Sequence, residues 1–317
     1  MYDTFIATCA RTPAYFNVFT EKLRQRASIE LPVHSGEDIS ERSVSRSTLR
    51  QVLFSGMDDV IGFGKAFTRY EQAADGTVTA FFDDGTTASG DILVSAEGTR
   101  SAVRQQYLPD APVRDTGITA IATNTPLTGQ TRALLPTAAQ RGISLIFGTR
   151  ALMGLVHVME FPSHAERDYL NLSIWGVHAK FPAGVHDQRG RNLIGTALDA
   201  TRNWHPHLRA LLEESDPAAA FPVRIVTSAP VDPWTPTTVT LLGDAIHTMT
   251  PGQGVGANTA LRDAALLCRA LTAAARPALP AWPRQARPVR GAKLRQPDRQ
   301  DSRPPPQIPR RPVQVPR

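Results

Sequence analysis

The sequence predicts a mixed α/β protein in which helices follow short buried strands and an antiparallel sheet is inserted between them. Two observations predict the α/β part. The apolar runs Val239–Leu242 and Asp91–Val94 are each followed by a glycine and then by a helical pattern. The third observation predicts the sheet, because residues 116–180 alternate in polarity or carry β-branched side chains and show little helical periodicity.

The junction after Val239–Leu242 has the composition of a small-molecule site. Gly243 and Asp244 end the strand, and Asn258 begins a helical pattern. The loop between them contains Pro251, Gly252, Gly254 and Gly256. The helix residues spaced to share a buried face are Leu261, Ala264, Ala265, Leu267, Cys268 and Leu271. A carboxylate at a strand end beside a helix N-terminus favours a bound ligand. The alternative is an ordinary connection whose glycines only make turns.

The composition is that of a globular protein with an unusual C-terminal segment. The chain has 317 residues and 34.5 kDa, with 41% hydrophobic and 20% charged residues. Its two cysteines, Cys9 and Cys268, cannot form a disulfide framework, and the second is expected to be buried. No signal peptide and no membrane-spanning run is recognisable, so a cytoplasmic protein is expected.

The basic balance of the chain resides in residues 276–317. This segment has ten Arg and one Lys against two Asp, so the rest of the chain is mildly acidic within a total of +6. That distribution argues against nucleic acid as a partner of the folded part. Eleven prolines and the absence of apolar periodicity predict a disordered tail, with polyproline-II character at Pro304–Pro306. A PxxP ligand, a nucleic-acid tail and out-of-frame translation of a GC-rich gene are alternative interpretations.

The N-terminal third is expected to contain peripheral pieces followed by a helix and a strand meander. Residues 1–36 are interpreted as peripheral, with a polar helix-like piece over Thr20–Ala27. Ser47 is expected to cap a helix that buries Leu49, Val52 and Leu53. Arg46 stands at the mouth of this helix, either as a solvated charge or as a cation facing a phosphate or ribityl chain.

A three-stranded meander is expected over residues 61–94. Its strands would be Phe67–Tyr70, Val78–Phe82 and Asp91–Val94, separated by the turn signals Asp75-Gly76 and Asp84-Gly85. The last strand runs into residues 95–104, where Glu97 precedes Gly98.

The middle of the chain is expected to form one side of a separate cavity. The strand candidates are Ile118–Thr123, Ile143–Phe147, Leu152–Phe161, Leu170–His178 and, further on, Val223–Thr227. Residues 193–214 are expected to form a helical segment interrupted near Pro206. The histidines of this region show no metal-ligand spacing, so no metal site is expected.

Three blocks of the chain resemble the FAD-dependent aromatic hydroxylases, the p-hydroxybenzoate hydroxylase-like flavoprotein monooxygenases. The first is Ser45–Leu53, similar to a family helix whose Arg contacts FAD. The second is Glu97–Arg104, similar to an Asp-Gly motif near the FAD pyrophosphate and NAD(P)H. The third is Gly243–Asp263, similar to the family's Gly-Asp motif. The resemblance covers about residues 40–272. It implies these FAD-binding residues: Arg46, Glu97, Gly98, Arg104, Gly243, Asp244, Pro251, Gly254, Gly256 and Asn258.

The resemblance also implies a domain organisation and a chemistry. An incomplete Rossmann-like FAD-binding domain would comprise residues 1–115 and 225–275, residues 116–224 would form a β-sheet substrate domain, and 276–317 would be disordered. The family uses NAD(P)H to reduce FAD and O₂ to hydroxylate an aromatic or related apolar small molecule. Asp244 would bind ribityl hydroxyls, and the glycines would let the backbone approach the flavin ring.

The chain departs from the family pattern at three points. No Gly-x-Gly-x-x-Gly unit is found near the N-terminus, Glu97 stands where the family has Asp, and the Arg/Pro-rich segment replaces the expected C-terminal helices. The alternative hypothesis is therefore a truncated, catalytically inactive flavoprotein remnant that acts at most as a binding or interaction protein.

Overall fold

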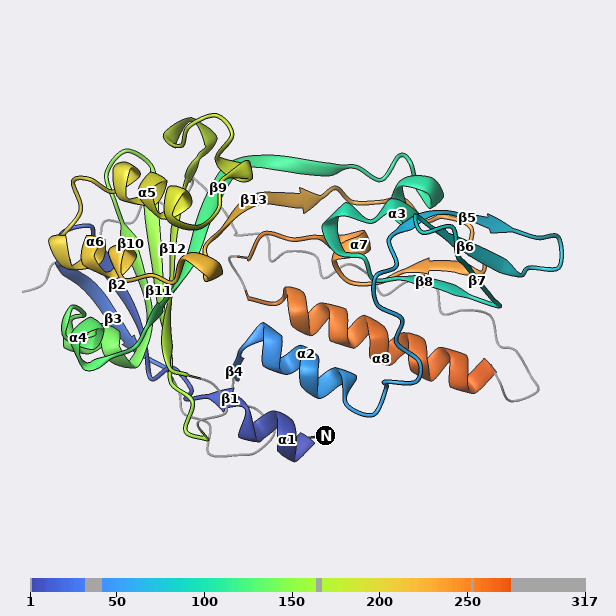
Figure 1. The fold of residues 1–317 in the computed structure, drawn as a ribbon, viewed down its shortest axis with the longest axis horizontal. Helices are drawn as coiled ribbons and strands as arrows, with labels where there is room; N and C mark the ends of the chain where they lie inside the picture. The colour runs from blue at the N-terminus through green and yellow to red at the C-terminus, as the bar shows by residue number, and fades with distance from the viewer. Residues whose placement is uncertain (1, 32–41, 164–166, 252–253, 275–317) are drawn as a thin grey trace, which may run out of the picture. The chain divides into compact units, whose positions relative to one another are not determined.

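The computed structural model of the protein describes residues 2–31, 42–163, 167–251 and 254–274. The chain divides into two units, Met1–Cys268 and Arg269–Arg317. The first unit contains every strand named below, and the last helix leads out of it (Figure 1). The tail predicted to be disordered, 276–317, lies outside the described residues.

A seven-stranded sheet forms the largest element of the structure. Its strand order is β13-β9-β12-β11-β10-β2-β3. The neighbours pair antiparallel except β10 and β2, which run parallel. The strands are β2 (Tyr15–Thr20), β3 (Gln25–Glu30), β9 (Val113–Pro126), β10 (Gly142–Phe147), β11 (Leu152–Met159), β12 (Tyr169–Val177) and β13 (Phe221–Ser228).

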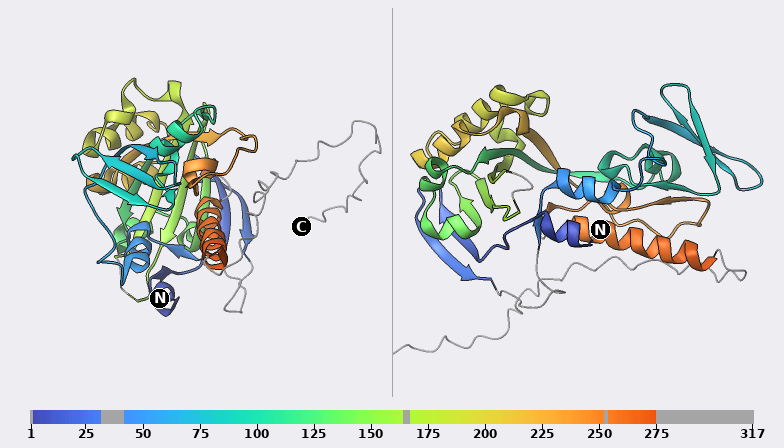
Figure 2. Two further views of the ribbon diagram at one scale, coloured as in Figure 1. Left: turned by 90° about the vertical axis from the view of Figure 1, so that its right-hand side faces the viewer. Right: turned by 60° about the horizontal axis from the view of Figure 1, so that its bottom comes forward.

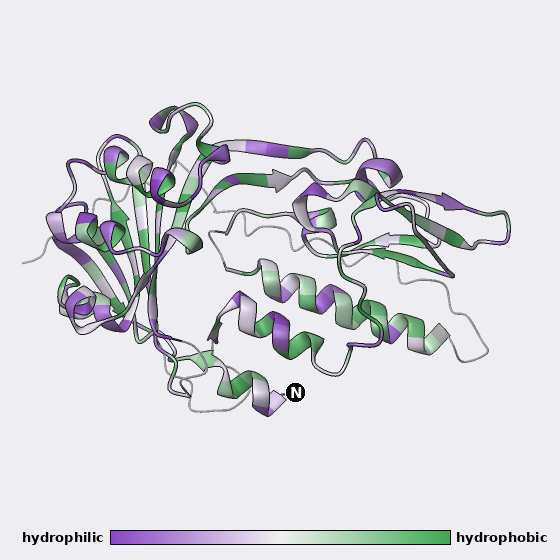
Figure 3. Ribbon diagram, in the orientation of Figure 1, coloured by the Kyte–Doolittle hydropathy of each residue, from purple (hydrophilic) through white to green (hydrophobic). Residues whose placement is uncertain are grey.

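One face of this sheet carries the main hydrophobic core. Alternate residues of β12 (Leu170, Leu172 and Ile174) are at most 1% exposed, as strand periodicity requires for a face against helices. The helices α5 (Gly190–Ala200) and α6 (Pro206–Glu213) pack on this face, and α4 (Gly129–Ala133) lies near its edge (Figure 2). Hydrophobic residues are concentrated on these strands and along the last helix (Figure 3).

A second, smaller core joins the elements that follow the two predicted junctions. Strands β8 (Leu93–Ser95) and β14 (Val239–Leu241) pair in parallel, with Leu93 opposite Val239. The helix α3 (Ala102–Tyr107) and the strands β5 (Phe67–Gln72) and β6 (Val78–Phe82) contribute to the same core, whereas β7 (Thr87–Gly90) pairs with β6 and is exposed. Its buried side chains are Tyr70, Val78, Val103, Val239, Leu241 and Ala245.

The remaining α-helices and strands of the described residues are short, except for the last helix. They are α1 (Tyr2–Ala7), β1 (Cys9–Ala10), β4 (Ser43–Val44), α2 (Arg46–Phe54), α7 (Asp244–His247) and α8 (Gly256–Ala274). Strands β1 and β4 pair antiparallel.

Two predictions about where the strands lie are wrong. The piece predicted as helical over residues 20–27 contains a turn followed by β3, and β2 and β3 extend the seven-stranded sheet instead of lying at the periphery. The third meander strand is β7, whereas the predicted strand 91–94 overlaps β8, which pairs with β14. The sheet therefore includes residues outside the predicted substrate domain, 116–224.

Two helix predictions are also wrong in detail. The helix expected to begin after Ser47 begins at Arg46, and Ser45 occupies its N-cap position. On α8 the less exposed stripe follows Ala260, Asp263, Ala264 and Leu267, whose spacing of three and four residues defines one helix face. Cys268 lies off this stripe and is exposed.

Candidate cofactor-binding site

The turn at Gly243 connects β14 to α7 and has a conformation that strongly favours glycine. Its φ of 56° and ψ of −136° lie in a region that L side chains rarely adopt. A Cβ atom at this position would lie 2.9 Å from the Cβ of Ala260 on α8. The sequence therefore uses a glycine and an alanine here so that the turn can lie directly against the helix.

Asp244 follows this turn with its side chain directed away from the core. It is the first residue of α7 and is exposed. Its backbone carbonyl accepts a hydrogen bond of 2.6 Å from the Thr248 hydroxyl, but its carboxylate has no partner in the described part of the chain. The carboxylate is therefore available to accept hydrogen bonds from a ligand.

The glycine-rich loop leads from this turn region into α8. The Gly254 N–H donates to the Pro251 carbonyl at 3.1 Å, and Gly254 has a φ of 64° with open space where a Cβ would stand. Gly256 begins α8, and Asn258 is exposed in its first turn. Gly252 lies outside the described residues. The free N–H groups of this 19-residue helix favour electron-rich ligand atoms near Gly256.

Glu97 has hydrogen-bond partners within its own turn and at the start of α3. Its Oε2 accepts hydrogen bonds from the hydroxyls of Ser95 (2.8 Å) and Ser101 (2.7 Å) and from the Val103 N–H (3.1 Å). Through this oxygen the exposed Glu97 stabilises the start of α3. Gly98, with a φ of 78°, has open space around it and remains accessible to a ligand.

Arg104 is a structural link between two of the three blocks. It is 6% exposed, and its guanidinium donates to the carbonyls of Ala245 (3.0 Å) and Thr99 (2.8 Å). Burial lowers the pKa of Arg104, while the nearby Glu97 opposes this shift. The side chain predicted to contact the cofactor therefore holds α7 against the turn after β8.

Further hydrogen bonds connect the segment around Glu97–Arg104 with the segment around Gly243–Asp263. Arg46 is not part of this hydrogen-bond network. The Leu242 N–H donates to the Ser95 carbonyl at 2.9 Å, and the hydroxyls of Thr248 and Thr99 lie 3.2 Å apart. Arg46 is exposed at the first position of α2, and its guanidinium has no partner within the described ranges. It is free to bind an anionic group.

Asp263 was missed as a candidate functional residue. Its Oδ2 accepts a 3.0 Å hydrogen bond from the Gly243 N–H and contacts Nε2 of His247. The sequence placed both residues in the motif but contained no local signal that they pair, because they lie on different helices.

His157 is a half-buried histidine whose partner the sequence did not reveal. It lies on β11, and its Nε2 is 3.3 Å from the hydroxyl of Ser43, on β4 shortly before the Arg46 helix. Burial lowers the pKa of His157 to about 4, so the ring is neutral near pH 7.

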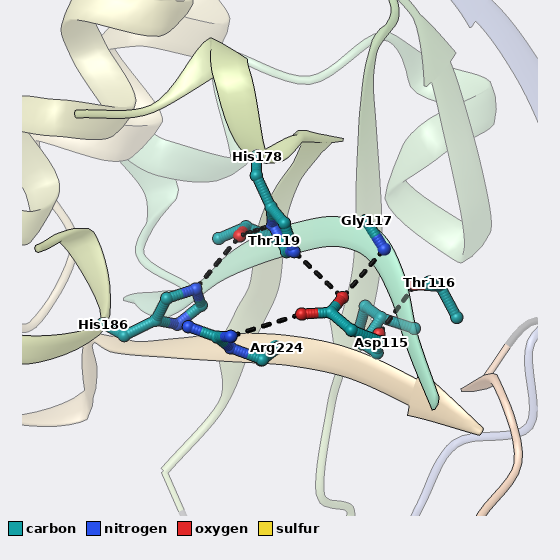
Figure 4. Close-up of polar contacts among 8 residues, drawn as sticks. Asp115, Thr116, Gly117, Thr119, His178, His186 and Arg224 are labelled. Atoms are coloured by element: carbon teal, nitrogen blue, oxygen red, sulfur yellow. Dashed lines mark hydrogen bonds and ion pairs between the residues drawn. The ribbon is translucent and has the colours of Figure 1, made fainter. Parts of the chain in front are cut away.

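A polar cluster around β9 and β13 also includes two histidines, His178 and His186, from turns that follow β12 (Figure 4). Asp115 contacts Nε2 of His178 at 2.9 Å and the Arg224 guanidinium at 3.2 Å. The Thr119 hydroxyl lies 2.8 Å from Nδ1 of His178 and 3.2 Å from Nε2 of His186. Thr119 is fully buried, so this chain of groups ties strands and turns together and offers no accessible nucleophile.

Backbone and side-chain groups of the cluster both shift the pKa values of its titratable residues. The Gly117 N–H donates to Asp115 at 2.8 Å, and this bond, with His178 and Arg224, lowers the pKa of the Asp115 carboxyl. Burial lowers the pKa of His186, and the positive charge of Arg224 adds to this shift. No group of three or more His, Cys, Asp or Glu that could hold a metal ion is found among the described residues.

A parallel strand pair, a Gly-Asp turn and a glycine-rich helix start define a nucleotide-cofactor-binding α/β protein. Comparison with known proteins makes this specific, since residues 59–281 match the family described as "FAD binding domain". The chain belongs to this family, whose relatives found by comparison are FAD-dependent monooxygenases.

Two curated relatives illustrate the family. A dual O-methyltransferase/FAD-dependent monooxygenase of Phaeosphaeria nodorum is 33% identical over 84% of this chain and 33% of its own length. An FAD-dependent urate hydroxylase of Klebsiella pneumoniae is 32% identical over 71% of this chain and 54% of its own length. The chain thus spans about a third to about half the length of these relatives.

Solved structures share the same fold. A candidate FAD-containing monooxygenase of Photorhabdus luminescens is 30% identical with a TM-score of 0.73, covering 87% of this chain and 73% of its own. A Klebsiella pneumoniae HpxO protein in complex with FAD is 25% identical with a TM-score of 0.67, covering 84% and 66%. Within the described ranges, no helix is long and apolar enough to span a membrane.

Proposed function

We propose that this protein is an FAD-dependent monooxygenase that hydroxylates an aromatic or related apolar small molecule, using NAD(P)H as reductant and O₂ as oxidant. The observation that carries the proposal is the exposed Asp244 carboxylate, held at a glycine-favouring turn against α8. Membership of the FAD-binding family and the FAD complex of a related structure support it.

The residues present fit the flavin and ribityl half of FAD better than its adenine half. Asp244 offers free acceptor oxygens for the ribityl hydroxyls, and the turn at Gly243 lies so close to α8 that it holds Asp244 near the start of that helix. Gly254 and the start of α8 would let backbone approach a flat ring and would favour negative charge at its edge. Arg104 would hold the frame of the site, since its guanidinium donates to two backbone carbonyls, and Glu97 would support the same frame through Oε2, which accepts three hydrogen bonds.

Bound FAD would supply the redox chemistry, accepting a hydride from NAD(P)H and activating O₂. The tasks of the chain would be to orient the ring through Asp244 and α8 and to place a substrate beside it. Arg46, at the exposed start of α2, would bind an anionic part of the cofactor.

For the substrate, we infer a flat molecule that packs against the face of the seven-stranded sheet opposite α5 and α6. Strand alternation places Asn171, Ser173 and Trp175 of β12 on this face, and the Trp175 indole donates to the Ser173 hydroxyl at 2.7 Å. An aromatic surface with a few amide and hydroxyl groups suits an aromatic or heterocyclic ring. Among the relatives, a urate hydroxylase and a 6-hydroxynicotinate 3-monooxygenase are named for heterocyclic compounds.

The first test is flavin binding by the full chain, measured from flavin absorbance and fluorescence during titration with FAD. Asp244→Ala should weaken the binding free energy by about 1.5–3 kcal/mol, because a hydrogen-bond acceptor with a charge is lost. Asp232→Ala, which removes an exposed carboxylate twelve residues upstream, is the matched control and should bind FAD like the wild type. Unchanged affinity in Asp244→Ala would refute the ribityl role.

Catalysis is tested separately on the flavin-loaded protein. NADH and NADPH are each added without oxygen, and bleaching of the flavin absorbance reports reduction. Oxygen uptake is then measured with a panel of hydroxylated benzoates, purines and pyridines, with product formation followed by mass spectrometry. A wild-type chain that binds no FAD would overturn the proposal and favour the inactive remnant.

A further inference from the structure

A single carboxylate on α8, that of Asp263, holds both ends of the segment that presents Asp244. Its Oδ2 accepts the Gly243 N–H at 3.0 Å on one side and contacts His247 Nε2 on the other. Gly243 precedes Asp244, and His247 ends the short helix α7 that Asp244 begins. The Asp263 side chain is 17% exposed, so water competes little for these bonds.

The segment between these two anchors has little freedom. The Gly243 carbonyl accepts hydrogen bonds from the N–H groups of Ile246 and His247, both at 3.0 Å. The turn also lies against Ala260, one helical turn before Asp263, where a Cβ on Gly243 would come within 2.9 Å. Ala260 thus sets how closely the turn approaches α8, and Asp263 fixes its orientation.

The direction of the hydrogen bond between His247 and Asp263 follows from the carboxylate. An ionised carboxylate only accepts hydrogen bonds, so His247 donates through Nε2. Nδ1 of His247 is buried and has no partner within the described residues. A proton on Nδ1 would be a buried donor without a partner among the described residues, so the geometry favours Nε2 as the ring nitrogen that donates. Asp263 therefore selects one tautomer and one orientation of this ring.

We propose that Asp263 is a positioning residue of the cofactor site, acting through Gly243 and His247 to hold the Asp244 carboxylate where it meets the ribityl hydroxyls. This inference rests on the proposed function, because it assigns to Asp263 an effect on FAD binding. Asp263 does not itself touch the cofactor. Asp263 belongs to α8 and contacts the turn from that side, whereas the Asp244 side chain is exposed.

A merely structural role for Asp263 predicts a different result from a positioning role. If Asp263 only stabilised the fold, its removal would weaken FAD binding by the same factor whether or not Asp244 is present. If it acts through Asp244, its removal should matter only while the Asp244 carboxylate is there to be positioned. A double-mutant cycle separates these two cases.

The experiment measures FAD dissociation constants for the full-length wild type, Asp263→Ala, Asp244→Ala and the double variant. Asp263→Ala alone should weaken binding about tenfold, and in the Asp244→Ala background by no more than about twofold. Arg262→Ala, an exposed neighbour on the same helix, is the control and should leave the affinity unchanged. Equal factors in both backgrounds, or unchanged affinity in Asp263→Ala, would overturn the inference while the proposed function stands.

A second variant and a second measurement make the test independent of gross unfolding. Asp263→Asn keeps an oxygen that can accept from Gly243 and should restore most of the affinity lost in Asp263→Ala. Amide hydrogen exchange at Gly243, measured without FAD, should be faster in Asp263→Ala and unchanged in Arg262→Ala. Unchanged exchange at Gly243 would overturn the anchoring argument. A wild type that binds no FAD would overturn the proposed function, and the inference with it.

Discussion

Replacing His157 by Gln tests whether this histidine is held neutral within the protein. The ring lies on β11 with Nε2 3.3 Å from the Ser43 hydroxyl, and burial lowers its pKa from the ordinary 6.5 to about 4. Gln keeps a polar group for Ser43 but cannot become charged in this range. The substitution therefore removes the titration and largely preserves the packing.

The direction of the effect follows from the depressed pKa. Between pH 6.5 and about 4 the unfolded chain binds a proton at this position that the folded protein does not bind. The stabilising contribution of neutral His157 is therefore complete above pH 6.5 and is lost as the pH falls towards 4. The free energy of unfolding lost from this group is about 2 kcal/mol at about pH 5 and approaches about 3 kcal/mol near pH 4.

Urea unfolding followed by circular dichroism at about pH 8 and about pH 5 measures this contribution. The wild type should lose about 2 kcal/mol more than His157→Gln over this interval. Identical pH dependence in the wild type and His157→Gln would show that the ring is not held neutral by burial.

Two further substitutions test the frame of the cofactor site by the free energy of unfolding. Gly243→Ala should cost about 3 kcal/mol, because it combines an unfavourable positive φ with a 2.9 Å approach to Ala260, whereas Gly117→Ala, with a φ of 78° and open space, should cost only about 1 kcal/mol. Equal losses would contradict the close approach. Glu97→Ala should cost about 2 kcal/mol, because three donors lose their acceptor, and the exposed Glu30→Ala should be neutral. A neutral Glu97→Ala would show that its contacts do not stabilise α3.

The features that local chemistry determines were predictable from the sequence. The strand at Val239–Leu241, the Gly243 turn and the helix after the glycine-rich loop follow from apolar runs, glycines and helical spacing within one stretch of chain. Asp244 directly follows this strand and turn and is exposed.

The features that depend on distant partners were not predictable. Strand β2 pairs in parallel with β10, placing Tyr15 opposite Gly142, and nothing near residue 15 indicates a partner so far along the chain. The register also explains one glycine, since a Cβ at Gly142 would lie 2.0 Å from the Tyr15 carbonyl oxygen. The predicted third strand of the meander, 91–94, is wrong for the same reason. It overlaps β8, which follows β7 in sequence but pairs with β14.

Three acidic residues show why a motif position does not by itself define a role. Glu97 accepts three hydrogen bonds from its own turn and the start of α3, so its charge is used within the protein. Asp263 accepts from the Gly243 N–H and His247, so it orients the neighbouring turn. Asp244 alone of the three has a carboxylate without a partner in the described part of the chain. Because an unpaired charge gains more from a new donor than a saturated one, Asp244 is the acid on which ligand binding should depend most directly.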